Sequence, residues 1–90
     1  MTHTTEQWWA GVKADSNKMN AWLQRQYIGE MAAVNLLSEV LLRFGSEATS
    51  EEWHNVHKVM CQEALHARWM REALERRGVE LEPNEIGRAH

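Results

Sequence analysis

The chain has 90 residues, a formal net charge of -3 and a sequence pI near 5.9. A chain this short forms one domain and buries only about 60 to 65% of its unfolded surface, so we expect a partner chain to stabilise it. Charges of both signs are interspersed, which gives no support to nucleic acid binding. With no apolar run of membrane-spanning length, no signal-like start and a single cysteine, the sequence favours a cytoplasmic protein with no membrane partner.

Residues 1–14 form the first predicted segment. Thr4 and Gln7 have the three-residue spacing of a helix start, and Trp8 and Trp9 follow directly. We therefore predict a short helix within this N-terminal segment.

Residues 15–44 have the periodicity of a long amphipathic helix. Asp15 or Ser16 is placed to cap its start, and Gly45 follows its last apolar residue as a stop. The apolar side chains recur at intervals of three and four, which predicts one buried stripe. The stripe contains Met19, Trp22, Leu23, Tyr27, Val34, Leu37, Leu41 and Phe44.

A second long helix is predicted to begin after the turn at "SEATS". Thr49 and Glu52 have the spacing of a capping box, and Gly78 ends the apolar pattern. Its stripe contains Trp53, Val56, Met60, Glu63, Ala67, Met70 and Leu74. Residues 79–90 contain the only proline, Pro83, and we expect a loosely ordered tail there.

Residues 15–78 therefore predict an all-α fold, an antiparallel two-helix hairpin, because the connecting loop is too short for any other arrangement. Two helices leave one face uncovered. The first helix is also apolar over a wide arc, since Met31, Leu36 and Leu42 fall outside its main stripe. We expect the hairpin to pair with a second chain into a four-helix bundle, as a homodimer or a higher even-numbered homo-oligomer.

Three polar residues lie on or beside the stripes that should be buried. Glu30 lies at the centre of the first stripe, Glu63 at the centre of the second, and His66 at the edge of the second, about 60° from Glu63. A buried carboxylate without a partner costs several kcal/mol, so something must compensate these charges. Glu30 and Glu63 both lie about 25 Å from the turn at 1.5 Å per residue. Glu30, Glu63 and His66 are thus candidate metal ligands, and a two-fold related copy would complete a site for two divalent cations.

The segments "QYIGEMAAV" and "QEALHARW" resemble the ferritin-like di-iron carboxylate proteins, in which one helix supplies a glutamate and the next supplies Glu-x-x-His. The resemblance covers about residues 15 to 78. Because the chain has a single hairpin, it resembles the encapsulated ferritins, which build their site across a subunit interface, more than the members that fuse two hairpins in one chain. The resemblance implies that Glu63 bridges two irons, that Glu30 is a terminal ligand and that His66 is the nitrogen ligand.

The resemblance further implies a ferroxidase-type activity, in which two Fe(II) per dimer are oxidised by oxygen or peroxide. Manganese or zinc would accept the same ligands. The sequence departs from the family pattern at Leu37, where many members have a tyrosine, and Tyr27 lies one turn before Glu30 instead. The tail "NEIGRAH" lacks the Gly-Ser-Leu type of docking peptide, so association with an encapsulin shell is unsupported.

Two rival functions remain open at this stage. The first is a ferritin-like di-iron oxygenase or peroxidase with an organic substrate, which needs a pocket leading to the site. The second is a non-catalytic dimerisation module or truncated half-bundle, in which an arginine such as Arg68 or Arg71 neutralises Glu30. A second metal site at His54, His57 and Cys61 is disfavoured, because these residues face away from Glu63.

Overall fold

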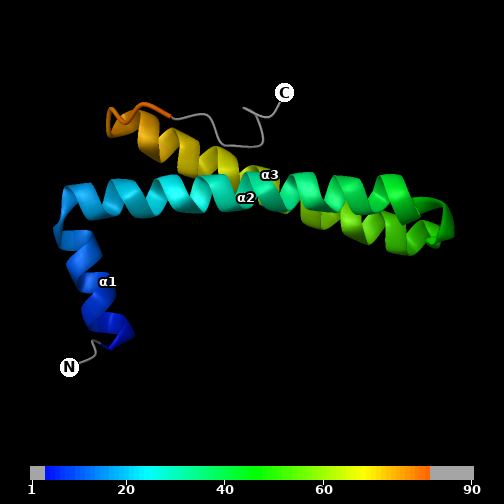
Figure 1. The fold of residues 1–90 in the computed structure, drawn as a ribbon, viewed down its shortest axis with the longest axis horizontal. Coiled ribbons are helices and arrows are strands. Elements are labelled where there is room, and N and C mark those ends of the chain that lie inside the picture. The colour runs from blue at the N-terminus through cyan, green and yellow to red at the C-terminus, as the bar shows by residue number, and fades with distance from the viewer. Residues whose placement is uncertain (1–3, 82–90) are drawn as a thin grey trace.

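The computed structural model describes residues 4–81, and all of their regular structure is helical. Helix α1 spans Thr5–Ala14, α2 spans Ser16–Phe44 and α3 spans Ser50–Arg76, with a single 3₁₀ turn, η1, at Gly45–Glu47. Helices α2 and α3 lie side by side and antiparallel, and α1 leaves the start of α2 at a steep angle (Figure 1). The predicted all-α hairpin is confirmed, with α1 as a third helix. The part of the predicted tail at residues 82–90 lies outside the described residues.

One extended residue, Asp15, separates α1 from α2. Its backbone lies at φ -116 and ψ 114, so the chain changes direction sharply at this point. Its carboxylate accepts hydrogen bonds from the backbone N–H groups of Asn17 and Lys18, at 2.9 and 3.1 Å. These bonds satisfy donors that the first turn of α2 leaves free, so Asp15 both ends one helix and caps the next. Of the two predicted caps, Asp15 is therefore the one used.

The predicted capping boxes are present at the starts of α1 and α3. At α1, Thr4 and Gln7 exchange side-chain to backbone hydrogen bonds of 3.0 and 3.1 Å. At α3, Thr49 and Glu52 do the same at 2.9 and 3.1 Å. Each box satisfies two backbone donors, which explains why both helices begin where the sequence pattern predicts.

Replacing Thr49 by alanine is expected to destabilise the metal-free protein by about 1 kcal/mol, because the Glu52 backbone N–H loses its acceptor. Thermal unfolding followed by circular dichroism measures the difference. Ser50→Ala is the matched control, since the Ser50 hydroxyl adjoins the cap but makes no capping bond. Equal stability of the two variants would contradict the role of Thr49.

The pKa of Glu52 is lowered from its usual 4.5, first by the hydrogen bond from the Thr49 backbone N–H and then by the Thr49 side chain. A carboxyl whose pKa is lower in the folded state stabilises the fold above its unfolded pKa. This contribution is therefore complete above about pH 4.5 and disappears as the pH falls through the folded-state pKa.

The core between α2 and α3 is small. Leu23, Ala67 and Leu74 are buried there, and Val12 is the buried residue of α1. At the open end of the hairpin, the Arg77 guanidinium donates hydrogen bonds to side chains at the start of α2, which tie the two helix ends together. So few buried side chains give little stabilisation to a lone hairpin, which agrees with the expectation of a partner chain.

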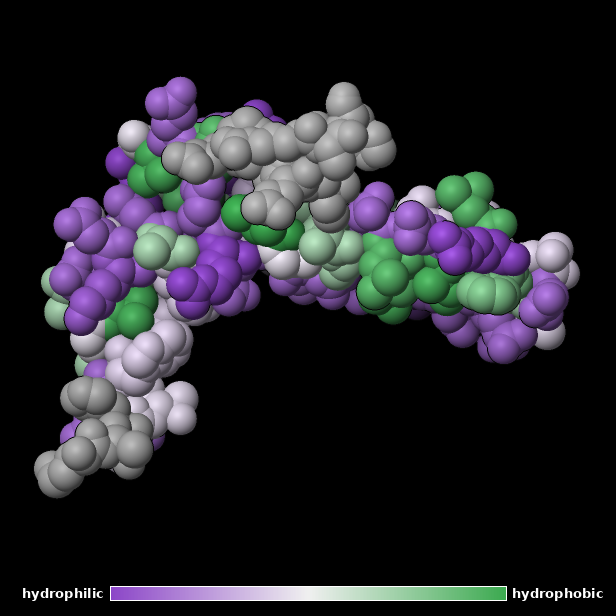
Figure 2. All heavy atoms as spheres, viewed as in Figure 1, coloured by the Kyte–Doolittle hydropathy of each residue, from purple (hydrophilic) through white to green (hydrophobic). Residues whose placement is uncertain are grey.

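Large apolar side chains remain exposed along both long helices. Hydrophobic residues gather on the half of the hairpin nearest the turn (Figure 2). Leu36 and Leu42 are 61% and 84% exposed, as their positions outside the predicted stripe indicate. Trp53, from the predicted second stripe, and Trp69 are also exposed. Within residues 4–81, no helix has a stretch apolar and long enough to cross a membrane.

Candidate metal centre

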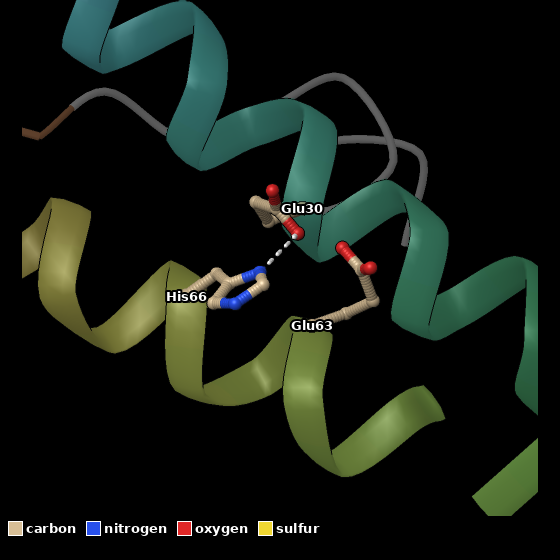
Figure 3. A group of neighbouring side chains, drawn as sticks. All are labelled: Glu30, Glu63 and His66. Carbon is tan, nitrogen blue, oxygen red and sulfur yellow. Dashed lines mark ion pairs between the residues drawn. The ribbon is translucent and has the colours of Figure 1, made fainter. Parts of the chain in front are cut away.

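The structure brings the three predicted ligands together between the two long helices. Glu30 extends from α2, and Glu63 and His66 extend from α3 toward it (Figure 3). One ligand atom from each side chain lies within 4.8 Å of the others. The helix periodicity thus placed all three on facing stripes, and the short loop set them at one height.

Glu30 is less exposed than His66. Its side chain is 19% exposed, against 44% for His66. The Glu30 Oε2 atom is buried and has no hydrogen-bond partner. Its nearest cationic group is His66 Nδ1 at 3.9 Å, a separation beyond hydrogen-bond range that gives an ion pair only when the imidazole is protonated. An orphaned carboxylate oxygen aimed at an imidazole is the expected state of a ligand set before a cation joins it.

The arginines considered as partners for Glu30 are engaged elsewhere in the same chain. Arg68 Nε donates to Glu72 at 2.8 Å, and Arg71 Nε donates to Glu75 at 3.1 Å. Both ion pairs are exposed, and in each pair the arginine lies one helical turn before its glutamate on α3. The pKa of Arg71 is raised, first by Glu75 and then by Tyr27 of α2. Neither arginine therefore neutralises Glu30 within this chain.

The second cluster of potential ligands is not assembled. His54 and Cys61 are exposed, and His57 instead stacks on Trp53, with ring centroids 4.1 Å apart and planes inclined by 25°. In the described part of the chain, Glu30, Glu63 and His66 are the one group of three or more such side chains with converging ligand atoms. The structure therefore gives no support to a second metal site at His54, His57 and Cys61.

Sequence reasoning missed the neighbour of His66. The Trp69 indole lies beside the imidazole, with ring centroids 5.6 Å apart and planes inclined by 36°. Spacing by three on a helix places these side chains next to each other, so the signal was present in the sequence. Gly29 is also informative, because a Cβ there would meet nothing within 4 Å. Among residues 4–81, no other segment therefore approaches Gly29 closely.

Two carboxylates and one imidazole suit a divalent transition metal such as iron, manganese or zinc. The residues fit such a metal, because the orphaned Glu30 oxygen lies within reach of both other ligands. One chain supplies three protein ligands, and the side of the cluster occupied by His66 is open to solvent. The cluster is therefore half of a larger ligand set or a small site completed by water.

Comparisons of the chain with models of known protein families, with curated proteins and with solved structures find no match. The class that the fold and site define is a helical hairpin with a Glu, Glu and His cluster between its arms. Any narrower assignment depends on the chemistry of that cluster.

Proposed function

We propose that the protein binds two Fe(II) per homodimer at a site shared between subunits and oxidises them with oxygen or peroxide, as the ferritin-like resemblance implies. The observation that carries this proposal is the convergence of Glu30, Glu63 and His66 within 4.8 Å, with the buried Glu30 Oε2 unpartnered. A negative charge on a buried oxygen without a hydrogen-bond partner destabilises the fold, and a bound cation would remove that destabilisation.

One uncovered apolar surface lies on the same side of the hairpin as His66, whereas Met31 and Leu42 are exposed on the opposite side. On α2, Trp22, Leu36, Val40 and Phe44 fall within an arc of about 80°, rotated about 100° from the side that packs on α3. On α3, Val59 and His66 are rotated by about 40° and 60° in the same sense from Glu63, which lies at the centre of the side that packs on α2. Because α2 and α3 run in opposite directions, rotation in the same sense about each helix axis turns both groups of side chains toward the same side of the hairpin. We call the surface formed by these residues the open face; it contains Trp22, Leu36, Val40, Phe44, Val59 and His66.

A second copy packed on the open face would complete the ligand set. A two-fold axis at the level of Glu30 and Glu63 brings two further carboxylates and one further imidazole to the cluster. Four carboxylates then face two divalent cations, so the charges balance. The same packing would cover Leu36, Val40, Phe44 and Val59, which are exposed in the single chain.

Each pair of Fe(II) ions supplies two electrons, which reduce one oxygen to peroxide or one peroxide to water. The chain's own residues would hold the two ions at a fixed separation and orientation. By the family resemblance, Glu63 would bridge the two ions, Glu30 would hold one of them, and His66 would supply the nitrogen ligand. The physiological purpose would be storage or detoxification of iron.

The rival oxygenase or peroxidase requires a substrate pocket beside the cluster. Two surface pockets lie elsewhere, one at the turn and one between α1 and α2. Neither includes a cluster residue in its lining, which consists of Gly45, Ala48, Thr49, Ser50 and Trp53 at the turn, and of Trp8, Val12, Lys18, Ala21, Trp22 and Arg25 at α1. Oxidation of iron itself needs only access of ions to the cluster.

Native mass spectrometry of the metal-stripped chain, loaded anaerobically with Fe(II), tests the proposal. We expect two irons per dimer, followed by consumption of both Fe(II) ions when oxygen is admitted. His66→Ala is expected to lose at least one of the two irons. His54→Ala is the matched control, because it removes an exposed histidine from another face of the same helix and should leave the stoichiometry unchanged. A dimer that binds no Fe(II), or an equal loss of iron in both variants, would refute the assignment of His66 as a metal ligand and favour the dimerisation module.

A further inference from the structure

The proposed function leaves α1 without a role, although α1 lies on the side of the hairpin that carries the cluster. Trp9 of α1 packs edge-on against Trp22 of α2, with ring centroids 4.8 Å apart and planes inclined by 61°. Trp22 belongs to the open face. Helix α1 therefore leaves the hairpin on that side, and the molecule has an inner corner between α1 and α2 (Figures 1 and 2).

We propose that α1 is a clasp for a second copy of this chain and that the corner formed by Trp9 and Trp22 receives the turn end of the partner's hairpin. This inference rests on the shared site, because that site determines which parts of two chains meet. It assigns a binding surface to a segment outside the metal cluster and commits that surface to one occupant.

The arithmetic of helix rise supports this placement. Phe44 lies 14 residues beyond Glu30 along α2, or about 21 Å toward the turn. Ser16 lies 14 residues before Glu30, at the same distance in the other direction. A two-fold axis at the level of Glu30 therefore places Phe44 of the partner subunit level with Ser16, where α1 begins.

The size of α1 also suits a clasp. Its ten residues span about 15 Å, whereas packed helices lie about 8 to 10 Å apart. Helix α1 is thus long enough to extend past a helix of a partner chain that packs beside α2. Trp8 is 49% exposed on α1, and Phe44 is 56% exposed at the turn end, so each surface offers an aromatic side chain that the single chain leaves uncovered.

The charges of the two surfaces are complementary. The turn end carries Glu47 and Glu51, both exposed. The corner between α1 and α2 carries Lys18 and Arg25, which line the pocket beside Trp8 and Trp22. Opposite charges at the rim of an apolar contact favour one orientation of the two chains over the other. They support an arrangement in which the turn of each hairpin lies at the α1 end of its partner.

Cross-linking of mixed chains tests the clasp directly. With Cys61 replaced by serine, one population carries Trp8→Cys and the other carries Glu47→Cys. Oxidation of the mixed, metal-free or metal-loaded dimer should form a disulfide between the two populations, and each population alone should form far less. A dimer that gives no mixed cross-link, in either metal state, would overturn the proposal.

Sedimentation of two alanine variants gives a second readout that does not depend on the cysteines. Phe44→Ala is expected to raise the dimer dissociation constant at least tenfold. Leu42→Ala is the matched control, since Leu42 lies near the same end of α2 but on the opposite side, and it should change the constant less than threefold. Equal effects would overturn the clasp.

The outcomes separate this inference from the proposed function. Two irons per dimer with no mixed cross-link would leave the iron site in place and remove the clasp. A mixed cross-link in a dimer that binds no iron would support the clasp and remove the iron site.

Discussion

Anaerobic addition of Fe(II) is expected to lower the dissociation constant of the dimer by about 100-fold or more. In the proposed dimer without metal, four carboxylates would gather at the interface and repel one another, and the buried Glu30 Oε2 of each chain lacks a partner within that chain. A ligand present at 100 times its own dissociation constant stabilises the form that binds it by about 2.7 kcal/mol, which corresponds to that factor. Sedimentation velocity of the chelator-treated chain, with and without Fe(II), measures the change.

Magnesium provides the control for this experiment. It prefers oxygen ligands in near-ideal octahedral geometry and retains its waters, so it should tighten the dimer far less than Fe(II) does. Equal tightening by both ions would indicate general charge screening rather than a site that uses His66. A dimer whose affinity is the same with and without Fe(II) would refute a metal site at the interface.

Replacing Glu63 by leucine is expected to have opposite effects in the two metal states. Without metal, the variant should form a tighter dimer, because removing one partly buried carboxylate per chain relieves the repulsion among the carboxylates of the cluster. With Fe(II), the variant should lose nearly all of the metal-dependent tightening, because the bridging ligand is gone. The same sedimentation measurement, made on both states, provides the two values.

Glu39→Leu is the matched control for that variant. Glu39 is an exposed glutamate on α2, so the substitution changes net charge equally without touching the cluster. It should preserve the full effect of Fe(II). If Glu63→Leu also preserved that effect, Glu63 would not be a ligand. If Glu63→Leu instead weakened the metal-free dimer, the carboxylate would have a stabilising partner at the interface.

The caps show how much of the fold local chemistry predicts. The boxes at Thr4 and Thr49 and the cap at Asp15 depend on hydrogen bonds within four residues, so sequence spacing is sufficient to find them. The stop at Gly45 was also placed correctly, although Gly45 keeps a right-handed backbone at φ -61 and does not use the freedom of glycine. The glycine in the left-handed region is Gly78, at φ 70.

The direction of α1 was beyond prediction from the sequence. It depends on the two backbone angles of Asp15 and on the packing of Trp9 against Trp22, and a polar residue between two helices is compatible with many such directions. Trp53 stacks on His57 and Trp69 lies beside His66, yet both indoles stay partly exposed in the single chain. Apolar periodicity identifies a face that should be covered, but it does not distinguish cover by the same chain from cover by another.

The sequence by itself determined that two long helices lie antiparallel and that Glu30, Glu63 and His66 face the space between them at one height. Helix periodicity and a short loop suffice for this, because both are local properties of the chain. Only the tertiary structure decided that their ligand atoms converge within 4.8 Å and that one Glu30 oxygen has no partner. Those facts depend on helix separation and on the side-chain conformations that packing selects, and no residue spacing specifies either.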